Sequence, residues 1–227
     1  MLYSILRGGV SFTQIVMYII AMAVIITVIL PFHELAHGFV AYKLGDDTAK
    51  RQGRLTLNPL AHIDPMGATC LLLVGFGWAS PVPVNMNRLK NPKRDMALVA
   101  LAGPVANIIA AIVGALLSNL LTVVFGSFFG TFWFKALQYF FSYYIMVNVS
   151  LAVFNLIPLP PLDGSKILGA FLPDHIYQKQ LENERTLSII LVALVMLDIV
   201  DKIVAVPNEL LLTFVYFVAT LPFLPFM

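Results

Sequence analysis

Residues 12–37 read FTQIVMYIIAMAVIITVILPFHELAH, a long apolar run that leads directly into two histidines and a glutamate. An apolar run of about 20 residues is long enough for an α-helix to cross the roughly 30 Å apolar core of a membrane. The apolar stretch 38–42 follows before Lys43, so His33 lies about 15 Å along the helix from that basic residue. Charged groups at such a depth cost on the order of 2.5–3.5 kcal/mol each. The cluster therefore needs a compensating interaction, which a bound metal ion supplies.

The motif His33-Glu34-Leu35-Ala36-His37 has the spacing of a metal site. Residues four apart lie on one face of a helix, so both imidazoles can reach the same ion. Two histidines at this spacing with a glutamate between them, acting as general base, form the zinc-binding pattern of metallopeptidases. Such a site needs a third protein ligand from the same side of the membrane and leaves one position open.

Asp163 is the candidate for that third ligand. It lies near the end of the segment 155–164, NLIPLPPLDG, where an apolar run is expected to return to the side of the membrane that carries the histidines. The prolines end helical structure and force an extended backbone, and Gly164 permits close approach. Leu-Asp-Gly alone is typical of a turn, but beside a submerged His-Glu-x-x-His motif we interpret Asp163 as a ligand.

The composition indicates an all-α polytopic membrane protein. Hydrophobic residues make up 59% of the 227 residues and charged residues only 11%, against about 25% charged in a soluble domain. The single cysteine, Cys70, excludes an intramolecular disulfide and a multi-cysteine zinc site. A net charge of +2 gives no indication of a nucleic-acid partner. No repeat or linker divides the chain, so we expect one membrane-embedded domain over residues 1–227.

The apolar runs predict about five to six transmembrane helices and one re-entrant segment. The run at 66–79 is too short to cross and contains glycines. Basic residues flank it on both sides, and basic loops favour the cytoplasm. We therefore expect a re-entrant β-hairpin-like loop near residues 66–85, an external N-terminus, and a metal site toward the cytoplasmic leaflet. The tail contains two apolar runs, which are interpreted either as two short spans or as a kinked pair.

Two signatures together resemble the site-2 protease family of intramembrane zinc metalloproteases. The pairing of His33-Glu34-x-x-His37 with Asn155-x-x-Pro158-x-x-x-Leu162-Asp163-Gly164 is similar to that family's motifs. The segments 58–67, 77–85 and 102–107 are similar to its short bacterial and archaeal members, which lack a PDZ or CBS domain. The resemblance covers about residues 12–172.

The resemblance implies one Zn²⁺ per chain, held by His33, His37 and Asp163, with Glu34 as the general base. It also implies that Asn155 donates a hydrogen bond to the substrate, although Asn155 is equally well explained as a residue at a helix C-terminus. The expected partners are membrane lipid and transmembrane protein or peptide substrates, cut in regulated intramembrane proteolysis. The expected location is a prokaryotic cell membrane.

Three alternatives stay open at this point. The chain could be a catalytically silent membrane protein of the same fold, a zinc or proton transporter, or a membrane-anchored peptidase that acts on soluble chains. The intact Glu34 argues against the first, and the scarcity of other intramembrane carboxylates argues against the second.

Two further segments are expected to serve the site. An edge strand around Val82 and Val84 would capture an extended substrate by strand addition. The small residues Ala102-Gly103-Pro104 would let helices approach closely, and Asn107 is placed to bond across helices.

Overall fold

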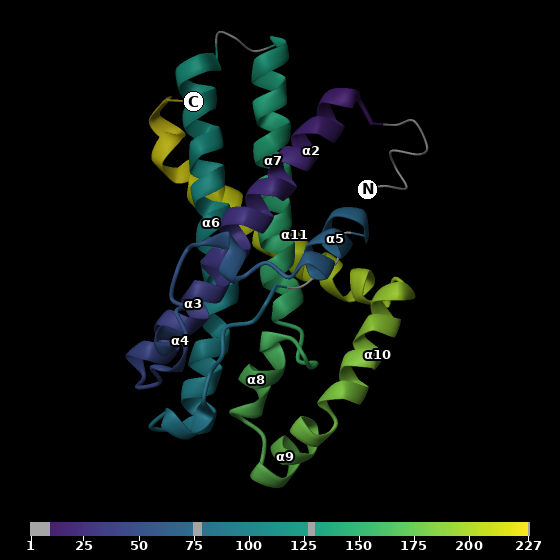
Figure 1. The fold of residues 1–227 in the computed structure, drawn as a ribbon. Coiled ribbons are helices and arrows are strands. Elements are labelled where there is room, and N and C mark those ends of the chain that lie inside the picture. Colours follow the sequence, from purple (N-terminus) through teal and green to yellow (C-terminus); the bar gives the residue numbers. More distant parts are fainter. Residues whose placement is uncertain (1–9, 75–78, 127–129, 227) are drawn as a thin grey trace.

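The computed structural model describes residues 10–74, 79–126 and 130–226, and within them the chain is all-helical (Figure 1). The predicted all-α class is therefore confirmed. The principal helices are α2 (Phe12–Val24), α3 (Leu30–Lys43), α4 (Thr48–Arg51), α5 (Pro65–Val74), α6 (Pro92–Phe125), α7 (Phe132–Asn155), α8 (Asp163–Gly169), α9 (Asp174–Glu182), α10 (Glu184–Met196) and α11 (Ile199–Thr220).

The first membrane-spanning helix contains a π-helical turn. It begins with a capping box between Ser11 and Gln14, and α2 passes into the π-helix η1 (Ile25–Ile29) and then into α3. Pro31 explains the irregularity, because a proline offers no N–H and its ring collides with the carbonyl four residues earlier. The chain responds with a wider turn, in which the Leu30 N–H bonds the carbonyl of Ile25 five residues back. This turn lies directly before the histidine motif.

Small residues on α6 allow the long helices to pack closely. Ala111 and Ala115 of α6 are fully buried against apolar side chains of α7 and α11, and Ala110 packs against α2 and η1. A side chain at Gly114 would collide with the ring of Tyr144 on α7. Helices in a membrane associate through such small residues, since lipid tails give no hydrophobic drive. Helix α6 is thus the central element, in contact with α3, α7, α8 and α11.

Within the described residues, four helical stretches are long and apolar enough to cross a membrane, namely Phe12–Lys43, Pro92–Phe125, Phe132–Asn155 and Ile199–Pro225. Helix α10 has 13 residues and reaches only about 20 Å, short of the roughly 30 Å required. The tail is broken between α10 and α11, where Asp198 adopts the left-handed conformation. The structure thus supports an integral membrane protein, while the fuller count of five to six spans stays a prediction.

The predicted re-entrant segment begins as a helix. Residues 65–74 form α5. Residues 79–85 are neither helix nor strand and lead into the short 3₁₀ turn η3 (Met86–Arg88). No β-strand is assigned in the described part of the chain. The turn of the expected hairpin falls on residues 75–78, outside the described residues.

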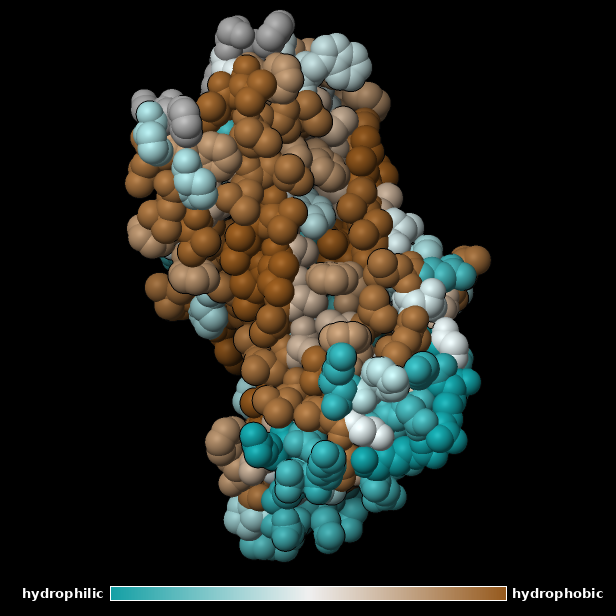
Figure 2. Space-filling model, turned by 90° about the vertical axis from the view of Figure 1, so that its left-hand side faces the viewer, coloured by the Kyte–Doolittle hydropathy of each residue, from teal (hydrophilic) through white to brown (hydrophobic). Residues whose placement is uncertain are grey.

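Hydrophilic residues gather at one end of the molecule. Figure 2 shows a hydrophobic surface over the upper part and a hydrophilic surface at the lower end, where Figure 1 places α4 and α9. Helix α4, which carries Lys50 and Arg51, belongs to this end. So does Lys93 at the start of α6, whose ammonium group bonds Asp174 of α9. The histidine motif lies on α3, between this polar end and the apolar region.

Candidate metal centre

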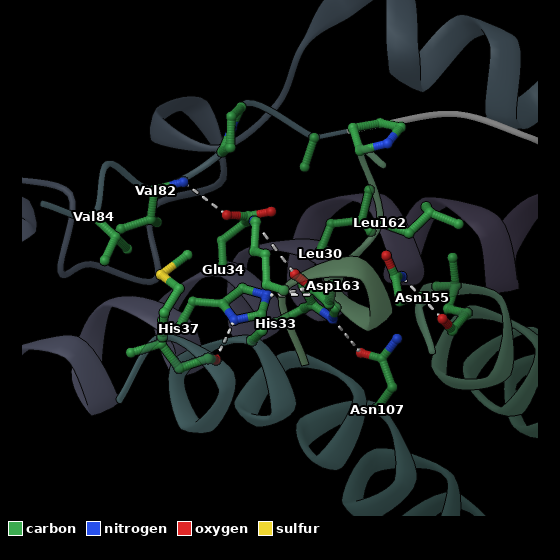
Figure 3. Close-up of a pocket in the computed structure, with 18 of the residues that line it drawn as sticks. Leu30, His33, Glu34, His37, Val82, Val84, Asn107, Asn155, Leu162 and Asp163 are labelled. Carbon is green, nitrogen blue, oxygen red and sulfur yellow. Dashed lines mark hydrogen bonds and ion pairs between the residues drawn. The ribbon is translucent and has the colours of Figure 1, made fainter. Parts of the chain in front are cut away.

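Three ligand atoms from distant parts of the chain converge at one point (Figure 3). The Nε2 atoms of His33 and His37 lie 3.1 Å apart, and the Oδ2 atom of Asp163 lies 3.5 Å and 3.2 Å from them. In a tetrahedral zinc site with bonds of about 2.0–2.1 Å, ligand atoms lie about 3.3–3.4 Å apart. All three side chains are buried. The residues present therefore fit a zinc ion.

The outer nitrogen of each imidazole faces an oxygen acceptor. His33 Nδ1 lies 3.3 Å from the Oδ1 atom of Asn107, and His37 Nδ1 lies 2.7 Å from the carbonyl oxygen of Val99. A neutral imidazole carries one proton, so an acceptor at Nδ1 leaves a lone pair at Nε2. Two nitrogen lone pairs and a carboxylate oxygen then face one another in a buried space. Such a group of acceptors is stabilised by a cation among them.

Asp163 reaches the histidines because the chain after α7 turns sharply. It is the first residue of α8, and adding a side chain at Gly164 would drive it into the carbonyl oxygens of Leu156 and Ile157. Burial raises the pKa of the Asp163 carboxyl, but hydrogen bonds and charge from His33 and His37, when these imidazoles are protonated, outweigh burial and lower the pKa below its ordinary range. The carboxylate is therefore ionised at neutral pH and available as a ligand.

Glu34 lies beside the convergent atoms on α3. Its Oε2 atom accepts a hydrogen bond of 2.8 Å from the backbone N–H of Val82, and its side chain is buried. The carboxylate is thus held by a backbone group of the segment 79–85. The arrangement leaves a glutamate next to the metal ligands, as expected for a general base.

The segment 79–85 is fixed to the rest of the protein at several points. The Ser80 N–H bonds the carbonyl of His62 at 2.7 Å, and the Arg54 guanidinium donates to the carbonyls of Ser80 and Pro81. At the other end, the Asn85 N–H donates to Asp46 at 2.6 Å. These bonds hold the Val82 amide in place above Glu34.

A pocket of about 410 Å³ opens over these groups. Its lining includes the three proposed metal ligands, Glu34, Asn107 and Asn155. Asn155 donates through Nδ2 to the carbonyl of Leu151 in its own helix, which is the behaviour of a residue near a helix end. Its amide group has a second hydrogen to offer, so both interpretations of Asn155 stay open.

The sequence did not reveal which groups bond the two histidines and Glu34. The backbone groups of Val99 and Val82 leave no sequence signal, because any residue carries a carbonyl and almost any an N–H. Asn107 did carry a sequence signal, because it lies four residues after Gly103 and therefore on the same face of α6. Its contact with His33 could not be assigned without the packing of α6 on α3.

A multi-helix membrane protein with a buried His, His, Asp cluster and an adjacent glutamate has the architecture of a membrane-embedded metallopeptidase. The model of peptidase family M50 matches residues 117–198, a range that contains Asn155 and Asp163. A protein of Bacillus subtilis (strain 168) named "Putative zinc metalloprotease YwhC" is 46% identical over 162 residues, which make up 70% of this chain and 74% of that protein. The chain belongs to peptidase family M50, the site-2 protease family that its motifs resemble.

A second relative is more distant. A protein of Mycolicibacterium smegmatis (strain ATCC 700084 / mc(2)155) named "Putative zinc metalloprotease Rip2" is 31% identical over 140 residues, or 58% of this chain and 49% of that protein. No solved structure matches the chain. Family membership and the four apolar helices together support a metalloprotease that is an integral membrane protein.

Proposed function

We propose that this protein is a zinc endopeptidase that cuts transmembrane proteins or peptides within or near the bilayer. The observation that carries the proposal is the convergence of His33, His37 and Asp163 beside Glu34. Each of the three ligand residues is buried, and the histidines lie on a helix long and apolar enough to cross a membrane. This combination favours hydrolysis at the membrane.

His33, His37 and Asp163 would hold the ion, one per chain. When bound, zinc supplies a Lewis acid that polarises the scissile carbonyl and favours ionisation of water. Glu34 accepts the proton of the attacking water and passes it to the leaving amine. The Val82 N–H keeps the carboxylate of Glu34 in the pocket during both transfers. Asn155 lines the same pocket and offers its remaining amide hydrogen to the substrate backbone.

The segment 79–85 is the proposed place where an extended substrate pairs. Its N–H groups are largely committed, because Val82 bonds Glu34 and Asn85 bonds Asp46, and the prolines at 81 and 83 have none. Strand addition through the Val82 amide is therefore not available while Glu34 holds it. Pairing would depend on the remaining backbone groups of this segment, since the Ser80 and Pro81 carbonyls already accept from Arg54. We retain a re-entrant path for residues 66–85 as part of the proposal.

The proposed site faces the cytoplasmic leaflet. The polar end of the molecule is rich in lysine and arginine, with Lys43, Arg51, Arg88 and Lys93 on or beside α3, α4 and α6. Such residues favour the cytoplasmic side of a membrane. The metal site lies between this polar end and the apolar region, which supports cleavage near the cytoplasmic surface of a prokaryotic cell membrane.

The decisive experiment replaces Glu34 by glutamine. We expect Glu34→Gln to keep one zinc per chain, measured by inductively coupled plasma mass spectrometry, because glutamate is not a ligand. Cleavage should fall by at least about 100-fold, the low end of general-base effects. Membrane fragments that accumulate in cells carrying the variant, identified by mass spectrometry, are then incubated with purified wild-type protein in vesicles.

Five results would count against the proposal or replace it. Wild-type protein without stoichiometric zinc, or a variant that cuts as fast as wild type, contradicts it. Zinc uptake into liposomes without cleavage would favour a transporter. Zinc binding with no accumulated fragment would favour a silent member of the fold, and equal cleavage of soluble peptides would favour a peptidase of soluble chains.

A further inference from the structure

The contacts of helix α6 with the histidine pair carry an inference that deepens the proposed function and rests on its metal site. Val99, Gly103 and Asn107 are spaced by four residues, so they lie on one face of α6. Adding a side chain at Gly103 would drive it into the Nε2 atom of His37 and the ring of His33. The backbone of α6 at Gly103 therefore lies directly against both imidazoles.

On either side of this contact, α6 presents an oxygen acceptor to each ring. Val99 accepts from His37 one turn before Gly103, and Asn107 accepts from His33 one turn after it. Both acceptors meet Nδ1, so each ring directs Nε2 to the point where Asp163 arrives. The acceptor for His37 is a backbone carbonyl, whereas the acceptor for His33 is a side chain that substitution can remove.

Asn107 is fully buried on a helix that crosses the membrane. Its Oδ1 atom bonds His33, while its Nδ2 atom has no partner among the described residues and belongs to a side chain that lines the pocket. A buried amide with an unsatisfied N–H costs stability, so packing alone does not account for an asparagine here. A leucine of similar size would satisfy a role in packing.

We propose that Asn107 is a positioning residue for the metal site, which fixes the tautomer and orientation of His33 by accepting a hydrogen bond from its Nδ1–H. If the Asn107 amide were flipped, its NH₂ group would donate to His33 Nδ1, and the ring proton would then sit on Nε2. A protonated Nε2 cannot bind zinc, so His33 would be lost as a ligand. The acceptor role is thus required, and a carboxylate at position 107 satisfies it equally.

The chain offers a matched control in Asn148. It is also fully buried on a membrane-spanning helix, but among the described residues its amide donates to the carbonyl of Tyr144 in its own helix and contacts no histidine. Asn148→Leu therefore removes a buried amide of the same type without touching a histidine. Any general effect of placing leucine at a buried asparagine appears in both variants.

The test measures zinc affinity by competition with a chromophoric chelator, using full-length protein in detergent. We expect Asn107→Leu to weaken zinc binding by about 10- to 100-fold, the usual effect of removing the partner of a ligating histidine. Asn107→Asp and Asn148→Leu should bind zinc as tightly as wild type. Should Asn107→Leu fail to fold, Asn107→Ala takes its place.

The outcomes separate this inference from the proposed function. Unchanged affinity in Asn107→Leu, equal losses in Asn107→Leu and Asn148→Leu, or a loss in Asn107→Asp as large as in Asn107→Leu overturns the role of Asn107 alone. Wild-type protein that binds no zinc overturns both proposals. Because affinity is measured without a substrate, the result does not depend on proteolytic activity.

Discussion

At the scale of single residues, the site depends on positions where no other side chain fits. Gly103 lets α6 touch both histidines, and Gly164 lets the chain around Asp163 pass against the carbonyls of Leu156 and Ile157. Glycine is required at both positions by close approach and not by an unusual backbone angle, since neither has a positive φ. The ligands themselves are therefore only part of what the sequence must specify.

Gly164→Ala is expected to disrupt the metal site. The new methyl group would collide with backbone carbonyls that cannot move without displacing Asp163, so zinc affinity should fall by more than about tenfold, as ligand orientation is lost. Chelator competition measures this.

Gly53→Ala is the control for that substitution. Position 53 has open space around it but a positive φ, so alanine there should cost about 1–2 kcal/mol of backbone strain and leave zinc affinity unchanged. Equal zinc affinity in Gly164→Ala and wild type would show that Asp163 is not held by this contact.

At the scale of elements, the loop after α3 is tied to the segment that holds Glu34. The buried carboxylate of Asp46 accepts from the N–H groups of Thr48 at 3.0 Å and Asn85 at 2.6 Å. Burial raises the pKa of Asp46, but the hydrogen bonds from Thr48 and Asn85 outweigh it and lower the pKa below the ordinary value. Asp46 thus links the end of the first span to the segment above the pocket.

Asp46→Ala should lower stability at neutral pH, by about 1.5–3 kcal/mol per lost charged hydrogen bond. Because the folded pKa lies below the unfolded value of about 3.9, this stabilisation is fully present above that value and is lost as the pH falls through the folded pKa. The difference in melting temperature between wild type and variant in detergent should therefore shrink from pH 7 to pH 3.

The neighbouring Asp47 provides the comparison. It forms partly exposed ion pairs with Arg51 and Arg88, and such pairs contribute about 1 kcal/mol or less. Asp47→Ala should therefore cost much less than Asp46→Ala. A pH-independent difference for Asp46→Ala would mean that packing, and not the charged carboxylate, stabilises this loop.

At the scale of the whole molecule, the ligands meet because two helices end on the same side of the membrane. The first span carries His37 toward the polar end, α6 leaves that end, and α7 returns to it just before Asp163. Lys93 at the start of α6 reinforces the arrangement through bonds to the Leu172 carbonyl and to Asp174. The site would be lost if either helix crossed in the opposite direction.

Labelling of single cysteines tests this topology. In a background with Cys70→Ser, cysteines introduced at Gln52 and Lys179 should react with a membrane-impermeant maleimide from one side of sealed vesicles. A cysteine at Thr131, between α6 and α7, should react from the other side. Reaction of positions 52 and 179 from opposite sides would contradict a metal site shared by His37 and Asp163.

Taken by itself, the sequence determined the all-helical membrane class, the two motifs that resemble the site-2 protease family and the candidate ligands. These depend on composition, on the spacing of four residues that brings two side chains to one helix face, and on prolines that end a helix. The hairpin expected near 66–85 shows the limit of this reasoning. A short apolar run rich in glycine does not distinguish helix from strand, and Pro65–Val74 is in fact helical.

Only the tertiary structure decided which groups hold the histidines and Glu34 in place. The acceptor at Val99 and the donor at Val82 are backbone groups, and Asn107 reaches His33 across 74 positions in sequence. Such contacts depend on how closely α6 approaches α3 and on how residues 79–85 are anchored. The physical reason is that a hydrogen bond requires a distance of about 3 Å, which only the packing of distant segments can set.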